Sequence, residues 1–480
     1  MTQLASKQTF VIGAGLAGSE AALVLANFGF EVVLIEQKPT QYSAVHRLPG
    51  AAELVCSNSF KSLEHGSAHG LLKAELMELQ SPLMQIAMRC RIPGGKALTV
   101  DRELFSQCVT EALKNHPRIT YREEECRSLP THTPTLVASG PLSSDALMKD
   151  LLRILEDDGL YFYDATSPVI TLESLEMEKF FWGARHDPFG SDYLNLPLTK
   201  EQYFEFRNDL LTAEKTEAHH PEESLKFFEG CLPIEVLAER GEDTLAFSCM
   251  RPIGLNPENL KPRPYAVIQF RREKAAGELL NMVGFQTRMK WPEQERVFRK
   301  LPGMGNAEFV RLGAMHRNTF INAPKHLNEK LELIRKPGYF FAGQLIGSEG
   351  YTEAVATGHY AALQMAGFRM LPELTAMRSL VRYLNHSDPL HFQPMNFNFG
   401  LLPDASSQIS DGSTLKGRRL GKSERNALRA SQALSQLKQW KEENWSNGGS
   451  ATWMSKSSSG VLARKLSEQD DRISNTSING

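Results

Sequence analysis

The apolar positions near the N-terminus follow a strand–helix–strand pattern. Residues 9–12 form a short, mostly apolar run typical of a buried strand, and residues 18–28 carry apolar side chains at helical spacing. Gly29 then ends the helical pattern as a C-cap candidate, and residues 31–35 form a second buried strand. This succession predicts a βαβ unit, and therefore a parallel sheet.

A second strand–turn–helix pattern occurs far down the chain. Residues 339–342 have the pattern of a buried strand, residues 343–351 are rich in glycine, and residues 353–365 have the spacing of a helix. Between the two patterns, aromatic residues, prolines and short strand-like runs predominate. We therefore expect an α/β fold in which a Rossmann-like domain is built from two parts of the chain and a mixed α/β substrate domain is inserted between them.

The expected domain boundaries follow these changes in pattern. The first part of the Rossmann-like domain spans residues 1–160, the inserted domain spans 161–330, and the second part spans 331–445. Residues 446–480 are rich in Ser, Asn and Gly and have little apolar periodicity, so they are predicted to be a disordered tail.

Weaker patterns fill the rest of the first part. Residues 37–70 read as a long loop, and long ordered loops in compact domains are usually functional. Residues 70–88 and 101–114 have helical patterns, and residues 92–100 contain a turn or hairpin. Residues 135–138 have the pattern of a strand and are followed by a turn.

The turn of the first βαβ unit carries a GxGxxG motif. Its residues are Gly13, Ala14, Gly15, Leu16, Ala17 and Gly18. Gly13 permits the tight turn, Gly15 lets the backbone approach a pyrophosphate, and Gly18 lets the helix pack close to the strand. The helix N-terminus offers free N–H groups to phosphate. Glu36, at the end of the next strand, can accept hydrogen bonds from ribose hydroxyls, so the motif predicts a dinucleotide site.

The later glycine-rich segment favours FAD over NAD. It contains Gly343, Glu349, Gly350 and Tyr351 between a strand and a helix, as two-part FAD proteins do where they hold the ribityl chain and the pyrophosphate. Glycines there allow the backbone to approach a cofactor closely. The strand and turn at 135–140 resemble the intermediate element of the same flavoproteins, so we expect a two-part (GR2-type) flavoprotein that binds FAD.

Composition and charge limit the range of partners. The chain has 480 residues and a net charge of −2, so no global field favours nucleic acid or an anionic membrane. An RNA partner would need a local basic patch; candidates lie at 271–274, 288–300 and 416–425, where solvated helix faces are the alternative. No stretch approaches about 18 uninterrupted apolar residues, so no membrane span is expected.

The 6 cysteines are scattered without a CxxC pair. This spacing argues against a zinc site or a disulfide scaffold, so we expect no metal and a reduced, cytoplasmic setting. Cys56 and Cys231 stand in polar, loop-like contexts, where a thiolate could act as a nucleophile if a helix N-terminus or a cation lowered the thiol pKa. His46 and Arg47 are near Cys56 in sequence. A buried, inert thiol is the alternative for each cysteine.

Several strings of sequence, in order along nearly the whole chain up to about residue 445, carry a specific resemblance. They are VIGAGLAGSEAA (11–22), ELVCSNSF (53–60), GLLKAEL (70–76), VDRELFS (100–106), FFEGCLPIE (227–235), GFQTRMKWPEQ (284–294), MHRNTFINAP (315–324), GQLIGSEGYTEAVATG (343–358) and FQPMNFNFGLLP (392–403). Together they resemble the folate- and FAD-dependent tRNA uracil-5-methyltransferases, the TrmFO family. Residues 61–69, with two histidines, depart from the Asn- or Gly-rich sequence expected there.

The resemblance implies methylation of carbon 5 of the T-loop uridine of tRNA. The carbon would come from methylenetetrahydrofolate and the reducing equivalents from NADH or NADPH, through FAD. The uridine would have to be extruded from the folded T-arm. By the matching strings, Cys56 corresponds to the family's nucleophilic cysteine and Cys231 to its second functional cysteine, while Glu349 and Tyr351 are expected near the isoalloxazine.

Three other functions remain open at this point. The same chemistry could act on ribosomal RNA. A flavin oxidoreductase acting on a small molecule would bind no RNA and would need no thiol that adds to a base. A non-catalytic, FAD-bearing RNA-binding protein would keep its RNA affinity after Cys56→Ala and would transfer no methyl group.

Overall fold

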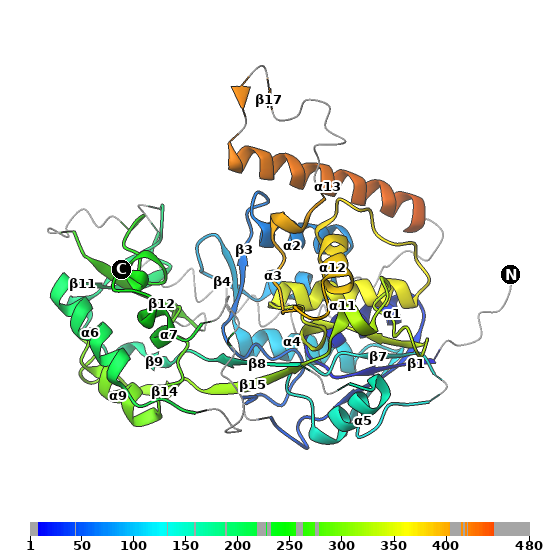
Figure 1. Ribbon diagram of the computed structural model, residues 1–480, viewed down its shortest axis with the longest axis horizontal. Coiled ribbons are helices and arrows are strands. Elements are labelled where there is room, and N and C mark those ends of the chain that lie inside the picture. Colours follow the sequence, from blue (N-terminus) through cyan, green and yellow to red (C-terminus); the bar gives the residue numbers. More distant parts are fainter. Residues whose placement is uncertain are drawn as a thin grey trace, which may run out of the picture.

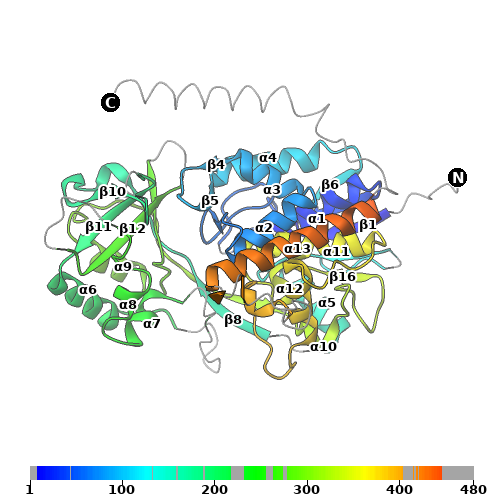
Figure 2. The same cartoon turned by 90° about the horizontal axis from the view of Figure 1, so that it is seen from above.

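The computed structural model describes most of the chain as two lobes joined by a two-stranded ribbon (Figures 1 and 2). The described residues are 8–43, 45–131, 133–157, 160–187, 190–217, 227, 232–255, 263–273, 278–403, 414–415, 418–419 and 421–445. Residues 446–480, expected to be a disordered tail, lie outside them.

The larger lobe is built on a five-stranded parallel sheet. Its strands, in spatial order, are β16 (Tyr339–Phe341), β7 (Thr135–Val137), β1 (Gln8–Ile12), β2 (Glu31–Glu36) and β6 (Ile119–Glu123). Every pairing in the sheet is parallel, which confirms the predicted βαβ unit. Because β16 joins β7 directly, the two distant parts of the chain share one sheet, as the repeated pattern predicted.

Two buried helices cover one face of this sheet and pack on each other. They are α1 (Leu16–Asn27) and α11 (Tyr351–Met365), and both are apolar on nearly all sides, as expected for helices inside a large core. A Cβ built at Gly358 would lie 2.2 Å from the Ala17 carbonyl oxygen, so the close crossing of the helices requires glycine at that position.

Residues 68–89 form two helices, so the single helix expected over 70–88 was wrong. These are α2 (Ala68–Glu78) and α3 (Pro82–Arg89). Gln80 has a positive φ of 59°, and Ser81 caps the second helix by accepting a hydrogen bond from Met84 N. Pro82 at the first turn completes a normal helix start.

A small antiparallel sheet flanks these helices. It joins β3 (Ser59–Ser62), β5 (Ala97–Val100) and β4 (Arg91–Ile92). Strand β3 lies inside the predicted long loop, whereas the predicted hairpin at 92–100 is confirmed by the β4–β5 pairing. The helix expected over 101–114 is α4 (Arg102–Lys114), and Asp101 caps it through bonds from Glu103 N and Leu104 N.

The smaller lobe is an antiparallel sheet with helices around it. The six strands, in spatial order, are β10 (Phe181–Gly183), β11 (Tyr193–Leu198), β12 (Ala266–Arg272), β13 (Leu279–Met282), β9 (Val169–Thr171) and β14 (Phe309–Arg311). The helices are α6 (Lys200–Thr212), α7 (Ile234–Glu239), α8 (Thr244–Phe247) and α9 (Trp291–Arg299). This lobe has its own hydrophobic core.

The ribbon between the lobes pairs β8 (Leu160–Ala165) with β15 (Met315–Phe320) in antiparallel register. The chain enters and leaves the smaller lobe through it, and both views place it between the lobes (Figures 1 and 2). The numerical domain boundaries stay predictions.

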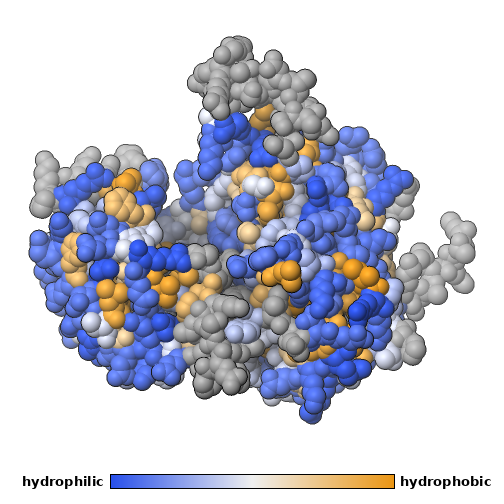
Figure 3. All heavy atoms as spheres, in the orientation of Figure 1, coloured by the Kyte–Doolittle hydropathy of each residue, from blue (hydrophilic) through white to orange (hydrophobic). Residues whose placement is uncertain are grey.

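The remaining helices complete the larger lobe. They are α5 (Asp145–Leu155), α10 (Ala323–His326), α12 (Ala376–His386) and α13 (Lys422–Trp445). Helix α13 lies across α2, and Lys441 Nζ pairs with Glu78 Oε1 at 3.1 Å (Figure 1). The face seen in Figure 3 is mostly hydrophilic with scattered apolar patches. Within the described residues, no helix has both the length and the apolar character needed to cross a membrane.

Candidate functional site

A cavity of about 1230 Å³, its open mouth included, lies at the carboxyl ends of β1, β2 and β7. This is where parallel α/β sheets bind their ligands. Of the sequence-predicted residues, it is lined by Gly13, Ala14, Gly15, Leu16, Ala17, Glu36, Cys56, Gly343 and Tyr351. Gly18, Glu349 and Gly350 are not in the lining, and Cys231 lies outside the described residues.

The glycine-rich turn has the geometry of a dinucleotide cradle. A Cβ on Gly18 would lie 1.8 Å from the Gly13 carbonyl oxygen, whereas a Cβ on Gly15 would meet nothing within 4 Å. Gly18 is therefore needed for packing, and Gly15 keeps the backbone open to the cavity. No side chain caps the N-terminus of α1, so its first N–H groups are available to phosphate.

Glu36 holds the turn from the end of β2. Its carboxylate accepts hydrogen bonds from Ala14 N at 2.7 Å and from Lys38 N at 3.0 Å. Each carboxylate oxygen can accept a further bond, so Glu36 fits its predicted role toward ribose hydroxyls. The residues of the cavity thus fit the adenosine and pyrophosphate parts of FAD.

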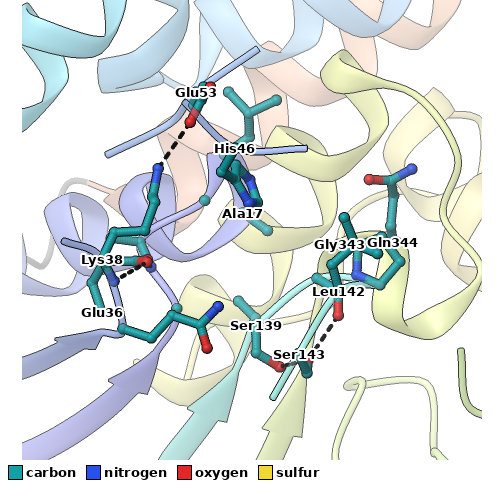
Figure 4. Close-up of a pocket in the computed structure, with 18 of the residues that line it drawn as sticks. Ala17, Glu36, Lys38, His46, Glu53, Ser139, Leu142, Ser143, Gly343 and Gln344 are labelled. Atoms are coloured by element: carbon teal, nitrogen blue, oxygen red, sulfur yellow. Dashed lines mark hydrogen bonds and ion pairs between the residues drawn. The ribbon is translucent and has the colours of Figure 1, made fainter. Parts of the chain in front are cut away.

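Several lining residues carried no signal in the sequence patterns. Lys38 is 4 % exposed, and its Nζ donates to Gly50 O at 2.7 Å and pairs with Glu53 Oε2 at 3.3 Å (Figure 4). Ser143 Oγ lies 2.7 Å from Ser139 Oγ on the opposite wall (Figure 4). Lys38 and Glu53 were missed because they stand in the predicted long loop, whose sequence has no periodicity, and the two serines because a turn after a strand does not mark a particular side chain as part of a site.

Cys56 lines the cavity beside Tyr351. The Tyr351 hydroxyl oxygen accepts hydrogen bonds from Cys56 N at 2.8 Å and from Ser57 N at 3.1 Å. Burial raises the pKa of Tyr351 well above its ordinary value, so the phenol stays protonated. The Cys56 thiol donates to Asp164 Oδ2 at 3.8 Å. Asp164, from β8, is therefore a site residue that sequence reasoning missed.

A second carboxylate lies near Asp164. Glu349 is 4 % exposed, and burial, aided by the negative charge of Asp164, raises the pKa of its carboxyl to about 8. Gln344 Nε2 donates to Glu349 Oε2 at 3.0 Å. A carboxyl with this pKa exchanges its proton near neutral pH, which is what a general acid or base requires.

Two arginines distant in sequence hold the backbone of the Cys56 loop, whereas His46 lines the same cavity as Cys56. Arg102 Nη1 donates to Leu54 O at 3.0 Å, and Arg311 Nη1 donates to Val55 O at 3.4 Å. Burial lowers the pKa of Arg311, and the negative form of Cys56 acts in the opposite direction. Arg311 on β14 thus places a positive charge near the Cys56 thiol.

Polar side chains of the two lobes form hydrogen bonds and ion pairs with one another next to the Cys56 loop. Arg271 Nε donates to Asn58 Oδ1 at 2.8 Å, and Arg102 pairs with Glu273 at 2.6 Å. Arg271 is buried, so this member of the first basic cluster supports the loop from inside. In the second cluster, Arg296 and Lys300 pair with Asp209 at 3.0 and 2.8 Å. Among the described residues, no group of three or more His, Cys, Asp or Glu side chains could hold a metal ion.

The shared parallel sheet, the glycine-rich turns and the cavity between them define a Rossmann-like, two-part flavoprotein. The family model described as Glucose inhibited division protein A matches residues 8–370. The methylenetetrahydrofolate--tRNA-(uracil-5-)-methyltransferase TrmFO of Desulfitobacterium hafniense (strain Y51) is 46% identical over 437 residues, which are 90% of this chain and 98% of that protein. The chain belongs to this TrmFO family, among the relatives of GidA.

Further similarities agree with this membership. TrmFO of Natranaerobius thermophilus is 47% identical over 405 residues, which are 83% of this chain and 93% of that protein. Among solved structures, Aquifex aeolicus GidA in its form II crystal superposes with a TM-score of 0.61, at 15% identity, over 91% of this chain and 75% of that chain. At that identity the superposition supports the fold alone.

Proposed function

We propose that the protein is an FAD-containing, methylenetetrahydrofolate-dependent tRNA uracil-5-methyltransferase. The observation that carries the proposal is that Cys56 lines the same cavity as the glycine-rich turn, with its thiol 3.8 Å from the Asp164 carboxylate. The site proposed for the redox cofactor and the proposed nucleophile thus line one cavity. The names of the relatives supply the substrates that match this chemistry.

The cofactor would be held along the cavity by residues from both parts of the larger lobe. Gly15 and the N-terminus of α1 would take the pyrophosphate, and Glu36 would take the adenosine ribose. Gly343 and Tyr351 would lie at the flavin end. FAD, when bound, supplies the redox chemistry of the one-carbon transfer, and the protein supplies position and charge.

Cys56 would activate the target base. Carbon 5 of uracil is a poor nucleophile until a thiolate adds to carbon 6. The Sγ proton passes to Asp164, a C6–S bond forms, and the C5=C6 electron pair moves through C4 onto its oxygen as an enolate. Once carbon 5 has accepted the one-carbon unit, Glu349 removes the C5 proton, that electron pair re-forms the C5=C6 bond, and Cys56 leaves as a thiolate that takes its proton back from Asp164. FAD, when bound, would supply the electrons that reduce the transferred unit to a methyl group.

The second cysteine of the resemblance would act at the same end of the cavity. We propose this from the resemblance alone, since Cys231 lies outside the described residues. We further propose the T-loop uridine of tRNA as the target, NADH or NADPH as the reductant, and a cytoplasmic location, with ribosomal RNA as the second candidate substrate.

The test is to assay flavin-loaded protein with unmodified tRNA transcript, methylenetetrahydrofolate and NADPH. Mass spectrometry of the digested RNA should show 5-methyluridine, and Cys56→Ser should lower its rate at least about 1000-fold, because the nucleophile is lost. Cys249→Ser is the matched control, since Cys249 does not line the cavity. NADPH oxidation without any 5-methyluridine would favour the small-molecule oxidoreductase. Unaltered RNA binding with no methyl transfer by the wild-type protein would favour the non-catalytic alternative.

A further inference from the structure

Asn318 is a buried amide on the wall of the cavity. The residue is 1 % exposed and belongs to the cavity lining. Neither its Nδ2 nor its Oδ1 has a hydrogen-bond partner among the described residues. An amide buried with both its donor and its acceptor unpaired is costly. These two atoms therefore indicate a ligand group that offers an acceptor and a donor side by side.

Access to the cavity distinguishes Asn318 from other buried amides. Gln364 on α11 is also buried, and both its amide atoms likewise lack partners among the described residues. Gln364 does not line the cavity, however. Asn318 thus combines unmet hydrogen-bonding capacity with access to a bound ligand, and Gln364 serves as the matched comparison.

Two segments of the cavity wall hold the strand that carries Asn318. Thr319 N donates to Pro141 O at 3.0 Å, and Ile321 N donates to Leu345 O at 2.8 Å. Pro141 belongs to the turn after β7, and Leu345 belongs to the glycine-rich segment after β16. Residues of both segments line the cavity. Asn318 therefore stands beside the turns that follow two neighbouring strands at one edge of the parallel sheet.

The strand order of this sheet sets the direction of a bound dinucleotide. Four of its strands lie in the order β2, β1, β7 and β16, and neighbouring strands are about 4.8 Å apart. Glu36, which fits the adenosine ribose, ends β2, and the turn that fits the pyrophosphate follows β1. The turns beside Asn318 follow β7 and β16, on the other side of β1 from Glu36. An FAD molecule that runs from Glu36 past the N-terminus of α1 would therefore extend its flavin toward Asn318.

The pyrimidine portion of the flavin ring carries the edge that matches the amide. Its N3–H is a donor, and the carbonyl oxygens on either side, O2 and O4, are acceptors. The Oδ1 atom of Asn318 can accept from N3–H while Nδ2 donates to one of these oxygens, as amides do in bidentate recognition of base edges. Uracil and the pteridine ring of folate carry a similar edge. The two turns that hold the strand of Asn318 belong to the pattern of a two-part FAD site, and this favours the flavin.

We propose that Asn318 binds the N3–H and an adjacent carbonyl oxygen of the FAD isoalloxazine ring. The inference rests on the FAD content of the proposed function and is independent of its RNA substrate and of its nucleophile. The pair of hydrogen bonds would fix the orientation of the ring in the cavity. An N–H directed at a ring carbonyl also stabilises the reduced ring more than the oxidised ring, because reduction places more electron density on the ring. Asn318 would thus position the flavin and raise its reduction potential.

The first test compares FAD with N3-methyl-FAD, which has no hydrogen to donate from N3. The Asn318→Leu variant keeps nearly the shape of asparagine but has neither hydrogen-bonding atom. Titration of FAD-free protein, followed by flavin fluorescence, should show that the FAD dissociation constant rises about 10-fold to 100-fold in the variant. Wild-type protein should bind N3-methyl-FAD at least about 10-fold more weakly than FAD. This discrimination should shrink at least about 5-fold in Asn318→Leu, because no bond to N3–H is left to lose.

Asn318→Asp gives a second, independent readout. A carboxylate can still accept from N3–H, but it cannot donate to the ring carbonyl, and its negative charge opposes reduction of the ring. The midpoint potential of the bound flavin, measured by reductive titration against a reference dye, should therefore be lower than in wild type. The discrimination against N3-methyl-FAD should be kept in this variant.

The controls separate binding from folding. Because the FAD-free protein buries an unpaired amide, the urea midpoint of FAD-free Asn318→Leu should not fall below that of wild type. Gln364→Leu removes a buried amide away from the cavity, and it should keep the FAD affinity, the discrimination and the midpoint potential of wild type. If Asn318→Leu does not fold, Asn318→Ser replaces it, with the same expectations for the two flavins.

Three results would overturn the assignment. In Asn318→Leu, affinities for both flavins within about 2-fold of wild type would remove any contact between the amide and the flavin. Weaker FAD binding at unchanged discrimination would move the contact to another part of the cofactor, such as the ribityl chain. Unchanged flavin binding with a raised KM for methylenetetrahydrofolate or for tRNA would assign the amide to the pteridine or to the target base. Wild-type protein that binds FAD with this discrimination but transfers no methyl group would refute the proposed function and leave the assignment of Asn318 standing.

Discussion

Replacement of Gly15 by alanine should separate cofactor binding from folding. Gly15 is the N-cap of α1 with φ −70° and ψ −168°, an extended conformation that alanine adopts freely, and a Cβ there meets nothing within 4 Å. The loss of glycine's freedom in the unfolded chain stabilises by about 0.4–1 kcal/mol. Alanine at an N-cap costs a similar amount relative to glycine. The free energy of unfolding of the FAD-free protein should therefore change by less than about 1 kcal/mol.

The added methyl group enters the cavity where the pyrophosphate approaches α1. We expect Gly15→Ala to lose one charge-assisted hydrogen bond to phosphate, which contributes about 1.5–3 kcal/mol. The FAD dissociation constant should rise about 10-fold to 100-fold. The assay is titration of FAD-free protein with flavin fluorescence as the readout, beside urea unfolding of the same preparation.

Substitutions of two further glycines serve as controls for this experiment. Gly18→Ala puts a Cβ 1.8 Å from the Gly13 carbonyl oxygen, so it should lower the unfolding free energy itself by about 1–3 kcal/mol or more. Gly305→Ala has open space within 4 Å and lies outside the cavity lining, so it should alter neither property. An unchanged FAD dissociation constant in Gly15→Ala would refute the view that the pyrophosphate meets the backbone at this turn.

Three buried ionisable groups give further predictions. Burial raises the pKa of Glu349 to about 8, so kcat/KM should rise as the pH increases through about 8. The Glu349→Gln variant should lack this rise. An identical pH–rate profile in the variant would assign the rise to another group. Burial lowers the pKa of Lys73 from 10.5 to about 7, so the unfolded chain binds the proton more tightly and stability should rise with pH from about 7 to 10.5, by at most about 5 kcal/mol. Urea midpoints of Lys73→Met should lack this rise, and a rise of equal size would contradict the assignment. Burial raises the pKa of Glu75 from 4.5 to about 8, so the folded state holds the proton more tightly than the unfolded chain does. The free energy of unfolding should therefore fall as the pH rises from about 4.5 to 8. Urea midpoints of Glu75→Gln should lack this fall, and a fall of equal size would contradict the assignment.

Local patterns were sufficient for the dinucleotide end of the site. The buried strands, the GxGxxG turn and Glu36 lie within one βαβ unit, so their spacing in sequence fixes their spacing in the structure. The late glycine-rich segment was recognisable for the same reason. The break between α2 and α3 was also recoverable, since Ser81-Pro82 is a normal N-cap followed by proline.

The part of the cavity around Cys56 could not be derived in this way. Asp164 meets Cys56 across 108 positions of sequence, and Asn318 lies on another strand of the ribbon. Their approach depends on the register of β8 with β15, which is set by contacts between distant segments. No periodicity within either strand marks an aspartate or an asparagine as part of a site, so only the tertiary structure brings them into the lining.

The placement of Cys56 depends on both lobes rather than on its own loop. The larger lobe holds the backbone through the Tyr351 hydroxyl, which accepts from Cys56 N at 2.8 Å. The smaller lobe holds Asn58, two positions further on, through Arg271 of strand β12, whose Nε donates to Asn58 Oδ1 at 2.8 Å. Because buried hydrogen bonds of this kind are costly to break singly, a shift of one lobe would have to carry the Cys56 loop with it or lose one of these two supports. The distance between the Cys56 thiol and the glycine-rich turn at the start of α1 therefore depends on the arrangement of the two lobes, and any ligand that moved the smaller lobe would also move the thiol.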